Sequence, residues 1–310
     1  MSSRRRTFRI AAVATGIALV AAASPAAAAG VHPGPVNLPI AAWGHKTIPT
    51  IDVTMSTTQE FTAPDKVHAG WVTFRVGSAD SDYHGFEVAR ANPGHTIDEV
   101  INDLQLGLSG DLASNALGAR QLVRDGTLMG GVVTSPYAPQ EATLPLTPGT
   151  YYMFDFAEFD TGIPVNVHTL KVVGEMDWSG MPSFSSVIGM YINADGMPTF
   201  AAPNDFGAQS NILIYGQGDE LHEAVFRPIR DGITDQYISD FYTALDAGLP
   251  HGPSPWTGIQ HGFNAMSPGQ FAVFHVDLPP GGYALACYVP SDETGLAHAH
   301  MGMHQVVTLH

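Results

Sequence analysis

Short runs of apolar and aromatic residues, bounded by glycine and proline, recur along the chain. Examples are GWVTFRV at 70–76, NILIYG at 211–216, PGTYYMFDF at 148–156 and PGGYALACYV at 280–289. Runs of this length and composition predict β-strands between turns. In the strand predicted at 283–289 the side chains alternate. One face would carry Tyr283, Leu285, Cys287 and Val289, and the other Ala284, Ala286 and Tyr288.

Two segments have the features of a short helix instead of a strand. Thr96 precedes an acidic first turn, Ile-Asp-Glu-Val-Ile, and Thr234 precedes DQYISDFYTAL in the same way. Threonine is a favourable N-cap residue, and acidic side chains favour the first turn of a helix. We therefore expect one helix to begin after each of these threonines.

The chain contains an internal repeat. Residues 60–100 parallel 199–238, and 144–156 parallel 276–288. Within the first pair, His84, Gly94 and Thr96 correspond with identical spacing to His222, Gly232 and Thr234. Similarity over more than a hundred residues indicates two copies of one domain and not a short-period solenoid. We predict an all-β protein with a β-sandwich and an inserted helix in each half: domain 1 at 47–175, a linker at 176–186 and domain 2 at 187–310.

The first 29 residues have the pattern of a signal peptide. MSSRRRTFRI is basic, a short alanine-rich apolar run follows, and Ala27-Ala28-Ala29 provides small residues for cleavage. Arg5-Arg6-Thr7-Phe8 resembles a twin-arginine signal, with the ordinary secretory route as the alternative. We expect a secreted protein with an N-terminal extension at 30–46 and no membrane span after cleavage.

Charge limits the choice of partners. The formal net charge is −16, with 29 acidic residues against 13 basic ones. Such a chain repels phosphate backbones, so we expect no nucleic-acid partner. Motifs typical of hydrolases and nucleotide-binding proteins, such as Gly-x-Ser-x-Gly, His-Glu-x-x-His and a glycine-rich phosphate loop, do not occur in the sequence.

Candidate chemistry gathers near the C-terminus. Cys287 is the only cysteine, and HAHMGMH at 298–304 follows it. A single cysteine in an exported protein is a buried core residue, an intermolecular link or a metal ligand. Thiolate, imidazole and thioether together suit a copper ion. With His222 placed by the repeat, the predicted ligands are His222, Cys287, His298 and Met303, and His300, Met301 and His304 are secondary candidates.

These residues resemble the cupredoxins, Greek-key β-sandwiches that carry one copper for electron transfer. The segment LPPGGYALACYVPSDETGLAHAHMGM is similar to that of secreted bacterial cupredoxin-like proteins. The resemblance implies His222 and His298 as histidine ligands, Cys287 as the thiolate and Met303 as the axial thioether. Two features depart from the family pattern. Ten residues separate Cys287 from His298 instead of a few, and Glu223 stands where asparagine commonly follows the first histidine.

The first half lacks this full set. Asp155 stands in the position of Cys287, so domain 1 is predicted to be free of metal, although His84 and His168 with Asp155 form a weaker candidate site. Cleavage after Ala29 would place His32 third from the new N-terminus, a separate square-planar arrangement for Cu(II) or Ni(II).

The sequence therefore favours a secreted copper-binding protein, an electron carrier or copper buffer with one copper per chain. Such a protein would act with a redox or copper-transfer partner protein. The first alternative is a metal-free tandem sandwich that recognises a protein or glycan through its loops. The second is a copper oxidoreductase, but a single His-x-His pair, at 298–300, is too little for a trinuclear cluster.

Overall fold

The computed structural model describes residues 47–310 except 57–61, 81–82, 135–138 and 157–164. The predicted signal peptide, the extension at 30–46 and His32 lie outside the described residues. In the part of the chain that is described, no helix is long and apolar enough to cross a membrane.

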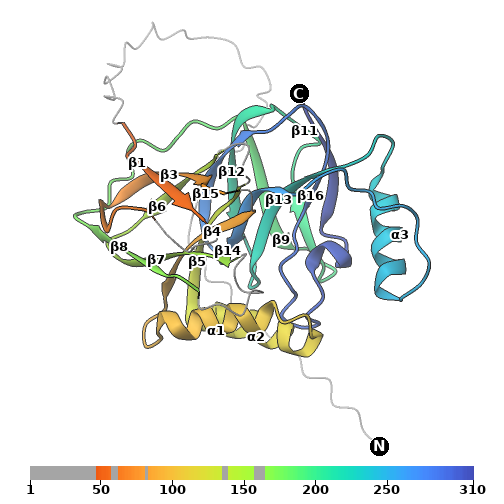
Figure 1. Ribbon diagram of the computed structural model, residues 1–310, viewed down its shortest axis with the longest axis horizontal. Coiled ribbons are helices and arrows are strands. Elements are labelled where there is room, and N and C mark those ends of the chain that lie inside the picture. The colour runs from red at the N-terminus through yellow and green to blue at the C-terminus, as the bar shows by residue number, and fades with distance from the viewer. Residues whose placement is uncertain (1–46, 57–61, 81–82, 135–138, 157–164) are drawn as a thin grey trace, which may run out of the picture. The chain divides into compact units, whose positions relative to one another are not determined.

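The described residues form two large β-sheets, as Figure 1 shows, which confirms the all-β fold class. The seven-stranded sheet has the order β1 (Thr50–Met55), β3 (Gly70–Ser78), β6 (Gln140–Leu146), β15 (Phe271–Asp277), β12 (Gln209–Gly216), β9 (Ser186–Ile192) and β10 (Pro198–Ala201). The ten-stranded sheet has the order β11 (Asp205–Phe206), β17 (His304–Leu309), β16 (Gly281–Ala286), β13 (His222–Pro228), β14 (His261–Met266), β5 (Gly126–Thr134), β4 (His84–Ala91), β7 (Gly149–Asp155), β8 (His168–Val173) and β2 (Lys66–His68).

The two halves of the chain have the same strand order. In the first half, β1-β3-β6 lies in one sheet and β2-β8-β7-β4-β5 in the other. In the second half, β9-β12-β15 and β11-β17-β16-β13-β14 repeat this arrangement. The parallel pairs correspond as well, because β1·β3 matches β9·β12 and β2·β8 matches β11·β17. The sequence repeat is therefore reflected in the topology.

Corresponding strands also join the halves. β6 pairs antiparallel with β15, its counterpart in the repeat, and β5 pairs antiparallel with β14. Both sheets consequently run without a break from one half to the other. The described residues belong to one unit, His45–His310, and the domain boundaries at 175 and 187 stay a prediction.

The predicted alternation along the last strand before the candidate ligands is present. Tyr283, Leu285 and Cys287 belong to the large hydrophobic core that draws on both sheets. Ala284 and Ala286 belong to a separate cluster that includes Ile238 of α3 (Asp235–Asp246). Cys287 follows directly after the end of β16 and is fully buried.

Both predicted helix starts are confirmed. Thr96 caps α1 (Ile97–Gly107): its hydroxyl accepts from Glu99 N at 3.3 Å, and the Glu99 carboxylate accepts from Thr96 N at 2.7 Å. Thr234 caps α3 by accepting from Tyr237 N at 3.2 Å. These capping contacts satisfy backbone donors that the first turn leaves free.

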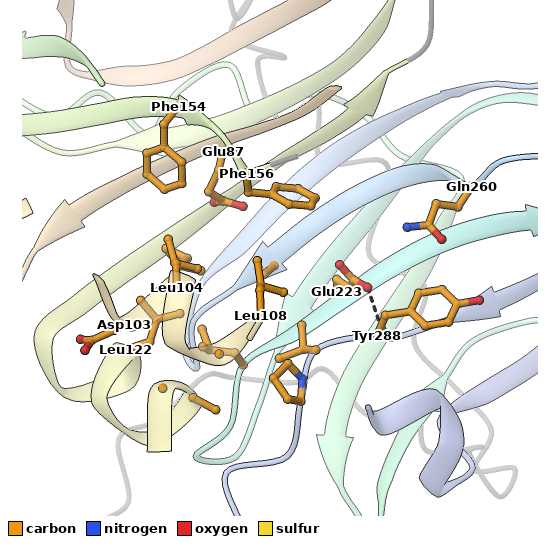
Figure 2. Close-up of a pocket in the computed structure, with 18 residues that line it drawn as sticks. Glu87, Asp103, Leu104, Leu108, Leu122, Phe154, Phe156, Glu223, Gln260 and Tyr288 are labelled. Carbon is orange, nitrogen blue, oxygen red and sulfur yellow. Dashed lines mark hydrogen bonds between the residues drawn. The ribbon is translucent and has the colours of Figure 1, made fainter. Parts of the chain in front are cut away.

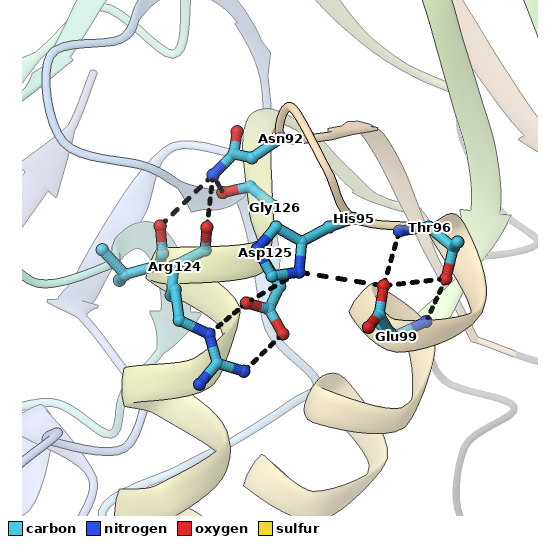
Figure 3. Close-up of polar contacts among 8 residues, drawn as sticks. Asn92, His95, Thr96, Glu99, Arg124, Asp125 and Gly126 are labelled. Carbon is cyan, nitrogen blue, oxygen red and sulfur yellow. Dashed lines mark hydrogen bonds and ion pairs between the residues drawn. The ribbon is translucent and has the colours of Figure 1, made fainter.

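The first half contains a second helix that the sequence pattern did not predict, α2 (Leu112–Asp125), which Asp111 caps. α1 and α2 pack closely because residue 118 is glycine: a Cβ there would lie 2.3 Å from Gly107 N. Figure 3 shows how the loop before α1 holds the end of α2, with Asn92 Nδ2 donating to the carbonyl oxygens of Arg124 and Gly126 at 2.9 and 3.1 Å.

The predicted linker has no strand or helix between Gly174 and Ser185, but part of it packs against the seven-stranded sheet. Trp71 Nε1 of β3 donates to the carbonyl of Trp178 at 3.3 Å. The Trp178 ring stacks on Phe271 of β15, with centroids 6.3 Å apart. This segment therefore contacts strands from both halves.

Candidate metal centre

Three of the predicted ligands come together at one end of the second half. His222 is the first residue of β13, Cys287 follows β16, and His298 opens the 3₁₀ helix η2 (His298–Met301). All three side chains are fully buried. Their candidate ligand atoms lie within 4.8 Å of one another, the one such group of His, Cys, Asp or Glu side chains among the described residues.

The spacing of these atoms fits a shared cation. The two imidazole Nδ1 atoms are 3.1 Å apart, and Cys287 Sγ is 3.5 Å from His298 Nδ1. A tetrahedral ion with metal–nitrogen bonds of about 2.0–2.1 Å and a metal–sulfur bond of about 2.3 Å separates its ligand atoms by about 3.3–3.6 Å. Little movement is therefore needed to place one ion between the three side chains.

His222 and His298 face each other through their Nδ1 atoms. Two ring nitrogens 3.1 Å apart face each other, so a proton or a cation must lie between them. The other ring nitrogen, His222 Nε2, is buried with no hydrogen-bond partner among the described residues. A buried polar atom without a partner is costly. His222 therefore has one ring nitrogen whose hydrogen-bonding capacity is unused, whether the two Nδ1 atoms share a proton or a cation.

Glu220 orients one imidazole, although no sequence motif points to it. Its Oε2 lies 2.5 Å from His298 Nε2, so the neutral ring donates that N–H to the carboxylate and keeps the Nδ1 lone pair for the cluster. Burial raises the pKa of Glu220 above its usual value. The sequence places Glu220 two residues before His222. Its contact with His298 depends on the path of the loop between Cys287 and His298, which the sequence does not predict.

Burial keeps the cluster uncharged in the protein alone. It lowers the pKa of His222, with a contribution from His298, to about 3, and it lowers the pKa of His298 to about 4. Burial also raises the pKa of the Cys287 thiol well above its usual value. The imidazoles are therefore neutral, as ligands must be, and a metal would have to displace the thiol proton.

Glu223, the departure from the cupredoxin pattern, supports Cys287 through its backbone. Glu223 N donates to Cys287 Sγ at 3.3 Å, a contact that favours a thiolate. Its carboxylate points elsewhere and accepts from Tyr288 N at 2.7 Å. The side chain in this position thus ties β13 to the residue after Cys287.

The long segment between Cys287 and His298 forms a loop whose two ends lie side by side. Pro290 and Ala297 form an isolated antiparallel bridge, and His298 N donates to Val289 O at 3.0 Å. Residues 291–296 form the loop that this bridge closes. His298 therefore lies beside Val289, two residues after the cysteine, despite the ten intervening residues.

Helix α2 of the first half holds this loop in place. Asn115 Nδ2 donates to Gly295 O at 3.4 Å, and Arg120 donates to the carbonyl of Asp292. Gly295 has φ of +71°, and a Cβ there would lie 1.8 Å from Leu112 O. Only glycine permits this approach, so the position of His298 depends on a helix from the other half.

Met303 lies next to the cluster in the chain and in the core. It is fully buried in the same hydrophobic cluster as Cys287. Its backbone oxygen accepts from Cys287 N at 3.3 Å, and its N–H donates to His298 O at 2.9 Å. The backbone of Met303 is thus fixed against both ligands, and coordination by its thioether stays a prediction.

The structure does not bring the secondary candidates into the cluster. His300 Nδ1 lies 2.8 Å from Asp246 Oδ1, and the ring stacks on Tyr242 of α3. His304 Nε2 lies 3.1 Å from Ser239 Oγ, also on α3. Met301 Sδ accepts from Thr294 Oγ1 at 3.7 Å. The two histidines therefore anchor η2 and β17 to α3.

The weaker candidate site of the first half is assembled only in part. His84 Nδ1 lies 2.5 Å from Asp155 Oδ2. His168 begins β8, the counterpart of β17, and its Nε2 lies 3.2 Å from Asp65 Oδ1. His168 therefore corresponds in the topology to His304 and not to His298.

The chain is similar to solved structures of copper proteins at low sequence identity. No protein-family model and no curated protein matches the chain. Among solved structures, auracyanin A, a "blue" copper protein from Chloroflexus aurantiacus, is 18% identical, with 41% of this chain and 100% of that chain covered and a TM-score of 0.31. Copper nitrite reductase from Nitrosomonas europaea is 13% identical, with 85% and 94% covered and a TM-score of 0.24. TM-scores this low carry no argument, so any assignment of function depends on the geometry of the cluster.

Proposed function

We propose that this chain is a secreted copper-binding protein, an electron carrier or a copper buffer, with one copper in its second half. The observation that carries the proposal is the buried group of His222, Cys287 and His298, whose ligand atoms lie within 4.8 Å of one another. Met303 is the proposed fourth ligand. When bound, copper would supply a one-electron couple, and the chain would supply its ligands and a dry environment.

The donor set favours copper over other metals. One sulfur and two imidazoles suit both copper and zinc, and a neighbouring thioether suits copper in particular. Magnesium and calcium prefer oxygen ligands, which the cluster lacks. The surrounding protein also matches the needs of an electron carrier, because fully buried ligands held by backbone hydrogen bonds move little when the charge of a bound ion changes.

The test is a copper titration of the purified chain from residue 30, followed by visible absorption. We expect an intense thiolate-to-copper band with the wild-type chain and its complete loss in Cys287→Ser. His300→Ala is the matched control, because His300 lies in the same 3₁₀ helix but contacts Asp246 and Tyr242. The control should keep the band. A parallel titration with Zn(II) establishes the preference between the two metals.

Two other results would overturn the assignment in different ways. Colourless copper binding that survives Cys287→Ser would point to other histidines or to His32 at the new N-terminus. No binding at all would leave Cys287 as a core residue and favour the metal-free module that recognises a protein or glycan. Secretion is tested separately, by mass spectrometry of the N-terminus of the exported protein, which we expect to begin at Gly30. The redox or copper-transfer partner would be a protein, since the charge of −16 disfavours nucleic acid.

A further inference from the structure

A cavity of about 240 Å³ lies between the α1–α2 pair and the ten-stranded sheet, and none of the three clustered ligands lines it. Figure 2 shows its lining, which is mostly apolar: Leu104, Leu108, Leu122, Leu128 and Phe154 are among the residues around it. An engineered apolar cavity of about 150 Å³ is enough to bind benzene. The cavity in this chain therefore has room for a compact organic molecule of one ring or a short alkyl chain.

Two buried carboxylates interrupt the apolar lining. Glu87 of β4 and Glu223 of β13 are 2% and 8% exposed, and Figure 2 shows both carboxylates pointing into the cavity. Glu87 Oε1 accepts from Gly130 N at 3.1 Å, and Glu223 Oε1 accepts from Tyr288 N at 2.7 Å. Each acid is thus fixed by a backbone N–H on one side and open to the cavity on the other.

Neither carboxylate forms an ion pair with a cationic side chain among the described residues. Burial, with a smaller contribution from Glu223, raises the pKa of Glu87 well above its usual value, and burial raises the pKa of Glu223 to about 7. Glu87 therefore holds a proton at neutral pH until a cation lies beside it. A buried carboxylate without a counter-ion is costly. Asp103 also lines the cavity, but Figure 2 shows its carboxylate pointing away from Glu87 and Glu223.

The chemistry of this site selects among possible ligands. An anion would oppose the ionisation of both acids, and a neutral apolar molecule would give neither of them a counter-ion. A metal ion would need three or more converging ligand atoms, and the group that meets this requirement among the described residues is the His222 cluster. An ammonium group can donate to a carboxylate and supply the charge that lets the buried acid ionise, while the apolar body that carries it fills the rest of the cavity.

We propose that this cavity binds a small organic cation, an ammonium group on a compact apolar body. The ammonium group lies between Glu87 and Glu223, and the body packs against the leucines of α1 and α2. Leu108, at the C-terminal end of α1, lines the cavity and is 42% exposed, so the ligand enters beside it. The site goes beyond the proposed copper function and does not depend on it.

The test is isothermal titration calorimetry of the metal-free chain from residue 30 at pH 7. The probes are 2-phenylethylammonium, 2-phenylethanol and 3-phenylpropionate, which share a phenyl ring and differ in charge. We expect the ammonium probe to bind at least tenfold more tightly than the alcohol, and the carboxylate probe to show no binding. n-Hexylammonium serves as a second cation with a flexible body.

Variants locate the binding. Glu87→Gln replaces an ionisable acid with a neutral amide of the same shape, and we expect it to weaken the ammonium probe at least tenfold while changing the alcohol little. Ala119→Leu, on the wall formed by α2, fills the cavity and should weaken every probe; if circular dichroism shows that it does not fold, Ala265→Leu in β14 takes its place. Glu175→Gln, an exposed acid outside the cavity, is the matched control and should bind like the wild type.

Three results would overturn the proposal. No binding of either ammonium probe would exclude a cation site of this size. Binding that is unchanged in both Glu87→Gln and the cavity-filling variant would place it elsewhere. Equal or tighter binding of the alcohol or the carboxylate would leave the cavity as a ligand site but remove the cation. Since no metal is added, each result is separate from the success or failure of the copper proposal.

Discussion

A histidine begins the corresponding strand in each half, and the two histidines have opposite charge states. His84 begins β4 and His222 begins β13. Burial opposes a charge on His84, but the hydrogen bonds that its ring donates to Asp155 and Asp80 outweigh it and raise its pKa to about 9. Burial lowers the pKa of His222 to about 3. One imidazole is charged at neutral pH and the other is not.

The difference follows from the carboxylates beside His84, with Asp155 contributing most. Asp155 ends β7 and lies 2.5 Å from His84, whereas Cys287 follows β16 at the corresponding place in the second half. A carboxylate holds a proton on the imidazole, and an imidazolium has no lone pair for a metal. A neutral thiol leaves the imidazole free to coordinate. In the first half an ion pair therefore stands where the second half has a cluster suited to a metal ion.

The largest expected effect is stabilisation of the folded chain by copper through the second half alone. At free copper 1,000-fold above the dissociation constant, binding adds about 4 kcal/mol to the free energy of unfolding. For a unit of this size the melting temperature should rise by roughly 10 °C. We expect His222→Asn to abolish the rise. His84→Asn should show the same rise, starting from a lower melting temperature without copper. Thermal melts with and without copper make the comparison, and an equal rise in the His222 variant would contradict it.

The next effect tests the ion pair of the first half. Asp155→Asn leaves a buried imidazolium without its closest carboxylate, and we expect the free energy of unfolding to fall by about 3 kcal/mol. Urea denaturation measures it. The control is Asp52→Asn, which removes the exposed partner of Arg75 at 3.5 Å and should change stability by less than about 0.5 kcal/mol. Similar effects of the two variants would show that the buried pair has no special role.

The same pair predicts a pH dependence. The folded-state pKa of His84, about 9, lies above the unfolded value of about 6.5, so the folded chain binds the extra proton between these limits. The stability that this proton provides is complete below about pH 6.5 and is lost as the pH rises through 9. Urea denaturation at pH 6 and pH 9 should show a loss about 3 kcal/mol larger in the wild type than in His84→Asn. Parallel pH profiles for the two proteins would disprove it.

The smallest expected effect concerns Glu220, whose carboxylate accepts a hydrogen bond from the His298 ring. Glu220→Gln weakens the hydrogen bond that orients His298, and we expect copper affinity to fall about tenfold, or about 1.4 kcal/mol. Competition with a chelator of known affinity measures it. Asp219→Asn, next to Glu220 but exposed, is the matched control and should change affinity less than twofold. If the two variants behave alike, overall charge and not the contact to His298 accounts for the change.

Local patterns predicted most of the fold. The alternation at 283–289 and the capping threonines Thr96 and Thr234 depend on neighbours in the chain, so the sequence is enough to find them. The repeat placed His222 with Cys287, and the structure brings these two together with His298. α2 was missed because its apolar face and its Asp111 cap are less distinct than those of α1, and because its packing on α1 depends on Gly118.

The structural features that the sequence could not predict depend on contacts between residues far apart in the chain. Nothing in the spacing from Cys287 to His298 shows that Pro290 and Ala297 close the intervening loop. HAHMGMH looks like one ligand-rich segment, but a 3₁₀ turn directs His298 inward and His300 toward α3. The buried acids Glu87 and Glu223 are far apart in sequence, and only the joining of β4 and β13 through β5 and β14 in one sheet brings them to one cavity.

The pairing of β5 with β14 and of β6 with β15 has a consequence for dividing this protein. A fragment covering residues 187–310 would expose the backbone of β14 and β15 along two open edges, and such edges promote aggregation. Because each edge normally meets its own counterpart from the repeat, the fragment would also be able to pair with a second copy of itself. Co-expression of the two fragments would instead favour reconstitution, which makes the chain suited to split-protein complementation.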